Sequence, residues 1–522
     1  MKDVEFNLLE ENWICVLKAD YTVQEVSLTE ALLHAQEYLD LAGETPMQDF
    51  AILRLLLAVL HTVFERVDEN GTPMPFEDVE DAVERWENLW SMEHFPEKPL
   101  CDYLQQWHER FWLFHSKFPF WQVPEFEKGT ECKAEKLNGE LSQSNNKKRL
   151  FANCEGKGAQ ELTYAQAARW LLSVNGCDDT AIKPKVGPGW LGKIGPIMAQ
   201  GRNLFETLLL NLVLAQDGEK LWGEPRPHWE CEMPRSEKGV KIALPDNAAE
   251  LLTLQSRRIL LKRKNGVVAG FEAIGGDVFE ESGAFTEQMT IWQVKKPKKN
   301  GPLEIEPKPH DPTRQFWREF PAAFVSQEDA RQPGVVRWVG KIQKYTQCPF
   351  ISFKIAAVKY GDKNMAFNDV FCDSLTFHTA LLSELKRSHR EMIRREVERC
   401  EKTAEQLSEL AGELVLAAGG SEKASKMKTA KEQWYYYIDQ PFRNWLKSID
   451  PDESDESKEE CCERWHKTAR KIADKLAQEM VEKTGPAAFV GRRIKNGKKE
   501  CFYAAPKSYQ AFQKQFKTIY EA

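Results

Sequence analysis

Residues 182–202 contain five glycines and three prolines, a density that excludes a regular helix or a central strand. The stretch also carries three lysines and one arginine but no acidic residue, although the whole chain has a net charge of −8. Helical patterns lie on both sides of it, at residues 164–174 and 204–215. We therefore expect an ordered loop between two packed helices, with backbone N–H groups and cations available to contact phosphate.

Part of this stretch, GPGWLGK at residues 187–193, matches the first seven positions of the phosphate-loop pattern of nucleotide hydrolases. The eighth position is Ile194, where a Ser or Thr hydroxyl should ligate Mg²⁺. The preceding KPKV is not a buried strand. Three interpretations remain open: a structural turn, a loop that touches a nucleic-acid backbone, and a nucleotide-hydrolysing loop.

The chain has 522 residues, 42% of them hydrophobic, which is enough for two or more folded domains. The N-terminus is acidic and lacks the apolar segment of a signal peptide, and the longest apolar runs are too short to span a bilayer. The 12 cysteines form no C-x-x-C pair, which favours free thiols in a reducing compartment. We expect a cytoplasmic protein without a membrane partner.

Charge is unevenly distributed along the chain. Residues 1–110 contain 24 Asp and Glu against 7 Lys and Arg, a net charge of −17, so residues 111–522 carry +9. This asymmetry is compatible with an acidic, solvated helical face. It also suits a basic region that binds a polyanion while the acidic region faces other proteins.

The order of the predicted elements indicates an α+β fold. Residues 251–263 and 266–271 are predicted to form one hairpin, and residues 351–360 and 365–371 a second one around a polar Gly-Asp-Lys-Asn turn. From Asp373 or Ser374 a helical stripe with apolar residues three and four apart runs to residues 419–420, and three further helical patterns follow. We predict a mixed α/β domain over residues 1–373 and an antiparallel four-helix bundle over residues 374–522.

No catalytic motif stands out. The pair His310-Asp311 lies among prolines and is expected in a loop, and Cys462 with His466 is at most half of a metal site. Neither H-E-x-x-H nor G-x-S-x-G occurs. We therefore expect a non-enzymatic protein without metal or cofactor. A protein–protein scaffold and a nucleotide-dependent enzyme using residues 187–193 are the alternatives.

Several segments together resemble one known family. FNLLEENWICV, FPFWQV, AARWLLSVNGCDDTAIKPKVG, LTLQSRRILL, DPTRQFWREF and YYYIDQPFRNWL occur in the order found in the large subunit of type I-E CRISPR Cascade, the CasA family. The resemblance runs from about residue 5 to about residue 450.

The resemblance implies a subunit that recognises the short motif beside the target, the PAM, in double-stranded DNA, mainly from the minor groove. It also implies a β-hairpin wedge that opens the duplex to start R-loop formation. The implied partners are the target DNA, the CRISPR RNA-containing Cascade subunits (the backbone, the small subunit and the subunit at the 5′ end of the crRNA), and a helicase-nuclease recruited after R-loop formation.

The resemblance also places the DNA-facing residues in three segments. A Phe-x-Asn motif corresponds to Phe151, Ala152 and Asn153, a glycine loop to Gly187, Gly189, Gly192 and the adjoining Lys193, and the wedge to Gly361, Asp362, Lys363 and Asn364. Three departures accompany the match: Asn364 stands where the wedge often has Gln, residues 275–290 contain no minor-groove lysine, and residues 262–276 contain no cysteine for a zinc site.

Overall fold

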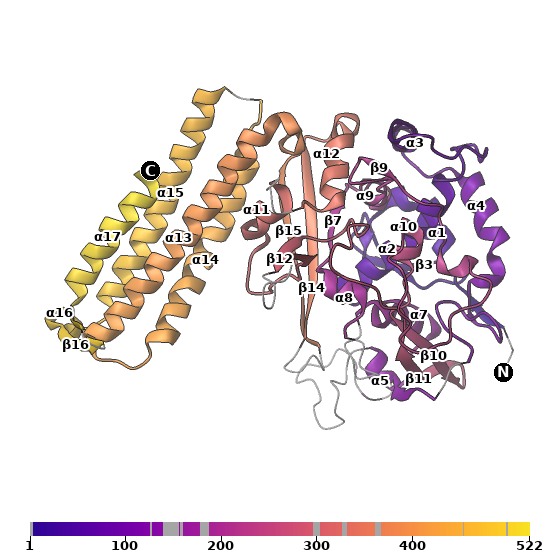
Figure 1. The fold of residues 1–522 in the computed structure, drawn as a ribbon, viewed down its shortest axis with the longest axis horizontal. Helices are drawn as coiled ribbons and strands as arrows, with labels where there is room; N and C mark the ends of the chain where they lie inside the picture. The colour runs from indigo at the N-terminus through magenta and orange to yellow at the C-terminus, as the bar shows by residue number, and fades with distance from the viewer. Residues whose placement is uncertain are drawn as a thin grey trace. The chain divides into compact units, whose positions relative to one another are not determined.

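The computed structural model describes residues 4–125, 128–138, 156, 160–177, 187–295, 303–325, 331–360, 367–452, 454–496 and 499–521. Its contacts divide the chain into two units. Met1–Arg314 and Ser326–Ser374 form the first, and Gln315–Val325 joins Leu375–Ala522 in the second. Helices and several small sheets build the first unit, and long helices dominate the second (Figure 1). The predicted α+β class is confirmed.

Helix α2 (Pro46–Phe64) is the central core helix of the first unit. Thr45 caps its N-terminus by accepting the Gln48 N–H, and Pro46 occupies the first turn, where its missing N–H costs nothing. Among the described residues, α2 is the one helix long and apolar enough to cross a membrane, but it is buried along its whole length. It therefore forms the core against which α7 (Tyr164–Cys177) and α10 (Ala248–Leu252) pack.

Two three-stranded sheets position the regions of interest in the first unit. One has the order β15–β14–β7, with β14 (Phe350–Tyr360) between β15 (Phe367–His378) and β7 (Ile197–Gln200). The other has the order β10–β11–β6, formed by β10 (Arg257–Lys264), β11 (Val267–Gly275) and β6 (Thr130–Lys133).

The first unit also contains the helices α1 (Leu28–Leu33), α3 (Val79–Ser91), α4 (Glu97–Gln106), α5 (Ala134–Leu137), α8 (Trp190–Ile194), α9 (Leu204–Asn211) and α12 (Gly334–Thr346). Its remaining strands are β1 (Glu5–Asn7), β2 (Ile14–Lys18), β3 (Val23–Val26), β4 (Tyr38–Leu41), β5 (Trp112–Phe114), β8 (Ala215–Gln216), β9 (Lys220–Leu221), β12 (Trp292–Lys295) and β13 (Glu304–Pro307).

Both predicted hairpins occur, with corrected boundaries. Strands β14 and β15 flank the polar turn as predicted, and the turn residues 361–364 lie outside the described part of the chain. The strand predicted from residue 251 begins only at Arg257. The preceding residues form α10 because the Asn247 side chain accepts the Glu250 N–H and caps a helix there.

The helix predicted to start at Asp373 or Ser374 does not start there. Strand β15 continues to His378, and α13 begins only at Arg387 after two 3₁₀ turns. Leu375 and Phe377 are buried at alternate positions, which is the period of a strand. Asp373 and Ser374 therefore belong to this strand and do not cap a helix.

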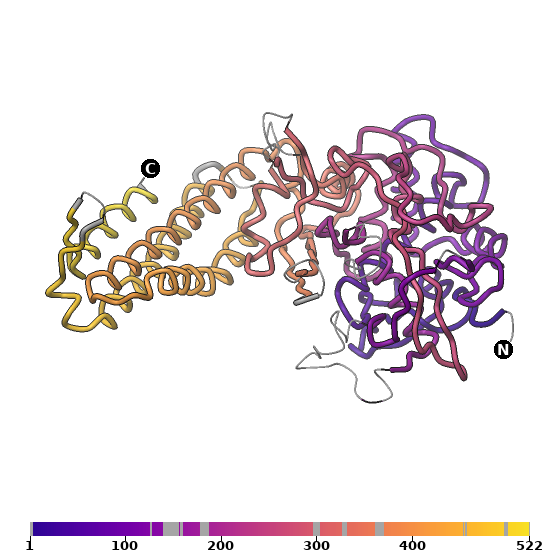
Figure 2. The backbone as a smooth tube through the Cα atoms, turned by 60° about the horizontal axis from the view of Figure 1, so that its bottom comes forward, coloured from indigo at the N-terminus to yellow at the C-terminus, as the bar shows by residue number. Residues whose placement is uncertain are grey.

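The second unit contains four long helices among its described residues, as predicted for a bundle: α13 (Arg387–Ala418), α14 (Lys423–Ser448), α15 (Asp455–Glu482) and α17 (Ala505–Glu521). They run side by side, from orange to yellow in Figure 2. Trp434 donates its indole N–H to the Cys400 carbonyl at 3.0 Å, and Trp445 stacks on Trp465 with ring centroids 5.2 Å apart. Shorter elements complete the unit: α11 (Phe320–Phe324), α16 (Pro486–Val490), β16 (Arg492–Asn496) and β17 (Lys499–Tyr503).

Candidate nucleic-acid interface

The glycine-rich segment is more regular than predicted. Residues 190–194 form the short helix α8 and residues 197–200 the strand β7, so the expectation of an ordered loop without a regular helix is wrong for this part. Trp190, Leu191 and Ile194 are buried, so α8 packs inside the first unit. The exclusion of a central strand still holds, because β7 lies at the edge of its sheet, where β14 is its neighbour among the described strands.

Two of the glycines permit close packing inside the protein. A Cβ atom at Gly189 would lie 2.4 Å from the Gly176 carbonyl oxygen. A Cβ atom at Gly192 would lie 1.9 Å from the Tyr360 hydroxyl oxygen. Both distances are far below van der Waals contact, so any larger residue would push α8 away from α7 or from β14.

Gly187 has a different role. It adopts a left-handed backbone conformation with φ +80°, which favours glycine. Its carbonyl oxygen accepts a hydrogen bond from the Arg257 guanidinium at 2.6 Å. Arg257 is 1% exposed, so a buried cation fixes the first described residue of the segment.

Lys193 does not have the environment of a phosphate-loop lysine. Its ammonium group pairs with Glu281 at 2.5 Å, and its side chain is 23% exposed. The following Ile194 is fully buried and has no oxygen to ligate Mg²⁺. This arrangement favours the packing interpretation of α8 over nucleotide hydrolysis.

The glycine segment and the predicted wedge hairpin meet at one point in the first unit. Tyr360, the last residue of β14, donates its hydroxyl hydrogen bond to the Cys177 carbonyl at 2.6 Å, at the end of α7. Gly192 lies against both residues, since a Cβ atom there would be 3.3 Å from the Cys177 Cα. Figure 1 shows α7, α8 and the lower end of β14 as neighbours. A hydrogen bond therefore joins the described ends of α7 and β14 to each other.

One basic residue is exposed directly beside this meeting point. Lys359 is exposed next to Tyr360. Burial raises the pKa of Asp311, but hydrogen bonds from Thr313 and the nearby charges of Arg314 and Lys359 outweigh it and hold the pKa below its usual value. The turn at Asp311 agrees with the prediction that His310-Asp311 lies in a loop. The resulting surface combines backbone, a hairpin base and cations.

Seven of the predicted residues lie outside the described part of the chain, so their positions remain predictions: Phe151, Ala152, Asn153, Gly361, Asp362, Lys363 and Asn364. Sequence reasoning missed Tyr360 and Arg257. Tyr360 ends an alternating strand directly before a turn, and Arg257 belongs to an arginine pair within an apolar strand pattern. Both patterns are recognisable signals once the fold is known.

The other candidate clusters have structural explanations. The His466 imidazole lies 3.0 Å from the Glu396 carboxylate, to which Trp465 also donates its indole N–H at 3.1 Å, so His466 is held by packing in the bundle. Within the described ranges, no group of three His, Cys, Asp or Glu residues has an arrangement that could hold a metal ion.

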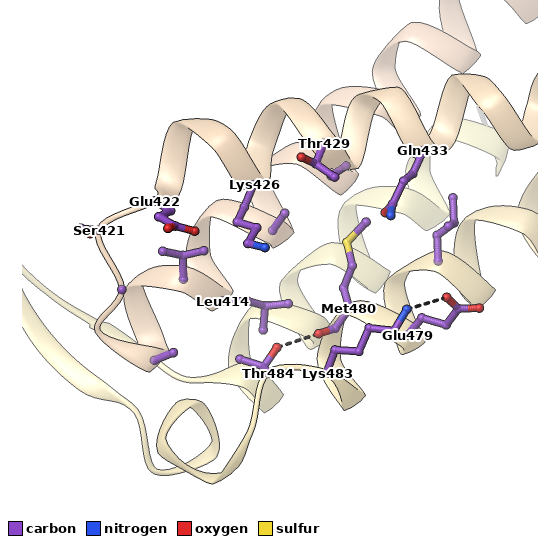
Figure 3. Close-up of a pocket in the computed structure, with 16 residues that line it drawn as sticks. Leu414, Ser421, Glu422, Lys426, Thr429, Gln433, Glu479, Met480, Lys483 and Thr484 are labelled. Carbon is purple, nitrogen blue, oxygen red and sulfur yellow. Dashed lines mark hydrogen bonds and ion pairs between the residues drawn. The ribbon is translucent and has the colours of Figure 1, made fainter.

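A cavity of about 490 Å³ lies in the bundle, between α13, α14 and α15 (Figure 3). Apolar side chains such as Leu414 and Met480 line it. Two of its polar groups are already engaged, because Lys483 pairs with Glu479 at 3.1 Å and Thr484 donates to the Met480 carbonyl at 2.6 Å. No titratable pair suited to acid–base chemistry is placed there by the described contacts.

Comparisons with known proteins agree with one another. The sequence model of the family described as CRISPR-associated protein Cse1 matches residues 7–476. A curated relative, the CRISPR-associated protein CasA/Cse1 of Thermus thermophilus, is 37% identical over 229 residues, and the aligned stretch spans 42% of this chain and 42% of that relative. Less than half of the curated relative's length is therefore matched at this level.

Solved structures are matched over almost their full length. Thermobifida fusca Cse1 has a TM-score of 0.81 at 26% identity, covering 99% of this chain and 98% of that one. Cse1 from Acidimicrobium ferrooxidans has a TM-score of 0.78 at 22% identity, covering 100% and 98%. A chain of a CRISPR RNA-guided surveillance complex has a TM-score of 0.68 at 16% identity, covering 99% of both chains. At these two lower identities the likeness concerns the fold alone.

Proposed function

The chain belongs to the CRISPR-associated Cse1 family, and we propose that it is the large, non-catalytic subunit of a type I-E CRISPR RNA-guided surveillance complex. In this proposal it recognises the PAM in double-stranded DNA and wedges the duplex open to start R-loop formation. It then helps to recruit the helicase-nuclease. Its constant partners are the CRISPR RNA-containing subunits.

The observation that carries the proposal is the hydrogen bond between Tyr360 and Cys177, with Gly192 packed against both. The wedge hairpin and the glycine segment are distant in sequence but start from one anchored point. A PAM reader needs this proximity, because the wedge must enter the duplex at the step directly beside the bases that are read.

The physical chemistry of the two segments suits this task. The minor groove is about 6 Å wide, so only backbone or slender side chains reach its floor. Separating one base step costs a few kcal/mol, which pairing between guide RNA and the freed strand can offset. In this proposal the long strands β14 and β15 hold the hairpin tip rigidly. The packed helix α8 provides a fixed surface beside them.

A nucleotide-hydrolysing function has less support. Lys193 is paired with Glu281, and Ile194 is buried where a hydroxyl would be required. A pure protein scaffold would not require β14 of the predicted wedge hairpin to be held against the glycine segment. The geometry therefore supports DNA recognition better than either alternative.

The experiment that tests the proposal uses the reconstituted complex with its CRISPR RNA. Target duplexes with randomised bases beside the protospacer are incubated with the complex, and the bound fraction is sequenced. The proposal predicts enrichment of a short motif at a fixed distance from the protospacer. Equal recovery of all flanking sequences would support the scaffold interpretation.

A further inference from the structure

A second cavity lies in the first unit, beside the start of β10, and its lining is polar. We call it the Gln255 cavity; it has a volume of about 170 Å³ and is lined by Arg226, His228, Arg235, Gln255, Arg258 and Asp277, among others. The volume is well above the ~10–15 Å³ that one water needs and below the ~300–1,000 Å³ typical of drug-sized ligands. It suits a ligand with a single ring system.

The walls of this cavity carry buried polar atoms without partners. Gln255 is 2% exposed, and within the described part of the chain neither its amide nitrogen nor its amide oxygen has a hydrogen-bond partner. The Nε of Arg258, which is 1% exposed, is also unpartnered. Leaving such groups unsatisfied costs about 1–3 kcal/mol each, so water or a ligand with complementary donors and acceptors is needed in the cavity.

Three arginines line the cavity against two carboxylates, those of Asp277 and Glu250, so its lining carries a small net positive charge. Arg258 pairs with Asp277 at 2.6 Å, and Arg235 pairs with the same carboxylate at 3.2 Å, so one acid is shared by two cations. Arg226 is 54% exposed and pairs with Asp246 at 2.6 Å and with Glu250, which also lines the cavity, at 3.3 Å. Burial, followed by the charges of Arg258, Arg235 and Arg110, lowers the pKa of His228 to about 3, which keeps this imidazole neutral at pH 7.

The strand that lines the cavity also reaches the glycine segment. Successive side chains of a strand point to opposite faces. Arg257 donates to the Gly187 carbonyl on one side, and Arg258 lines the Gln255 cavity on the other. An occupant of the cavity would therefore lie one residue along the strand from the anchor of the glycine segment.

We propose that the Gln255 cavity binds the base of one nucleotide, preferably adenine, with the phosphate near Arg226 and Arg235. A side-chain amide offers one donor and one acceptor, the complement of the N6 and N7 atoms of adenine. Exposed arginines at the mouth match the geometry of a phosphate. A free nucleotide and a base turned out of a nucleic-acid strand share this chemistry, so the inference goes beyond the proposed function and does not depend on it.

The test measures binding to the purified full-length chain by isothermal titration calorimetry. The probes are adenosine 5′-monophosphate, ribose 5-phosphate and a short adenine-containing single-stranded DNA. We expect adenosine 5′-monophosphate to bind more tightly than ribose 5-phosphate, which lacks the base. Gln255→Leu should weaken adenosine 5′-monophosphate roughly 5- to 150-fold, the value of one bidentate contact to a base.

Two arginine variants separate the cavity from general surface charge. Arg226→Gln should weaken binding of the phosphate-bearing probes. Arg493→Gln changes another exposed arginine that pairs with a carboxylate, but not one that lines the cavity, and it should leave binding unchanged. If Gln255→Leu does not fold, the proposal is tested by comparing how tightly the two arginine variants bind the phosphate-bearing probes.

The outcomes distinguish the sources of the base. Gln255-dependent binding of the DNA strand without binding of the free nucleotide supports the proposal and identifies a strand as the source. The proposal is overturned if neither adenosine 5′-monophosphate nor the DNA strand binds at millimolar concentration. The cavity would then be a site for water. Binding that Gln255→Leu leaves unchanged, or that falls equally in Arg226→Gln and Arg493→Gln, would also overturn it.

Discussion

The Tyr360 hydroxyl donates a hydrogen bond of 2.6 Å to the Cys177 carbonyl oxygen, joining residues 183 positions apart in sequence. It fixes the end of β14 to the end of α7, at the place where α8 passes between them. In the proposed function this contact sets the position of the wedge relative to the glycine segment. Loss of the contact should therefore affect DNA opening more than it affects folding.

Tyr360→Phe removes the hydroxyl and keeps the ring. We expect a loss of about 0.5–1.5 kcal/mol in the free energy of unfolding, the usual net value of one hydrogen bond, and a slower R-loop in the reconstituted complex. Denaturant unfolding and an R-loop assay measure the two effects. Tyr436→Phe is the matched control, because Tyr436 is 76% exposed. If both variants behave like the unmodified protein, the hydrogen bond has no role in positioning the hairpin.

Gly192→Ala tests the close approach of α8 to β14. The added Cβ would lie 1.9 Å from the Tyr360 hydroxyl oxygen, so Tyr360 must move and its bond to Cys177 must lengthen. Overpacking of this kind costs about 1–3 kcal/mol, visible as a lower denaturation midpoint. Gly412→Ala, also in a helix, meets only the flexible ends of Lys423 and Met427 and should be neutral or stabilising. Equal effects of the two substitutions would show that the contact at Gly192 is not tight.

Much of the fold was predictable from the sequence because it follows from periodicity. The long apolar stripe of α13 and the alternation of β14 each repeat over many residues. The start of the bundle was not predictable in this way. Asp373 and Ser374 have the residue types of a helix cap, and only the burial of Leu375 and Phe377 reveals that the strand continues.

The candidate site was harder to predict for a physical reason. A glycine is needed wherever another atom comes too close for a side chain, and that atom can belong to DNA or to the protein itself. The sequence does not distinguish the two cases. Gly189 and Gly192 are needed inside the protein, against Gly176 and Tyr360. A hydrogen bond from a side chain to a distant backbone carbonyl, such as that of Tyr360 to Cys177, leaves no pattern in the sequence at all.

Lys193→Ala tests the nucleotide-hydrolysis alternative. We expect no Mg²⁺-dependent ATP hydrolysis from the unmodified chain, because Ile194 supplies no metal ligand, and no change on substitution. The free energy of unfolding should change by less than about 1 kcal/mol, since the ion pair with Glu281 is partly exposed and screened by solvent. Phosphate release is the measurement. Metal-dependent turnover that Lys193→Ala abolishes would restore the enzyme interpretation.

Asp49→Asn should reveal a pH-dependent stability term in the core. Burial raises the pKa of Asp49 to about 7, although the Gly43 N–H and Lys354 act against the rise. The folded state therefore binds a proton that the unfolded state has released, so this contribution to stability is present at low pH and is lost as pH rises through 7. We expect the substitution to raise the melting temperature more at pH 8 than at pH 5, by about 1–2 °C per kcal/mol for a unit of this size.

The control for this pH effect is Asp68→Asn. Hydrogen bonds from Thr72 and Asn70 lower the pKa of this exposed carboxyl, so it is ionised at both pH 5 and pH 8. Its substitution should change the melting temperature equally at the two values. An Asp49→Asn effect that is equal at both pH values, or larger at pH 5, would contradict the assignment of a raised pKa.

The most direct test of DNA opening combines Lys363→Ala and Asn364→Ala in the reconstituted complex and measures the rate of R-loop formation. Non-specific DNA binding should change little, because many other basic residues contribute to that salt-dependent term. On a fully paired target the double variant should form R-loops more slowly. On a target already mismatched beside the PAM the deficit should shrink, since that base step is unstacked beforehand. Equal loss on both targets, or no loss on either, would contradict the account that this hairpin is the wedge.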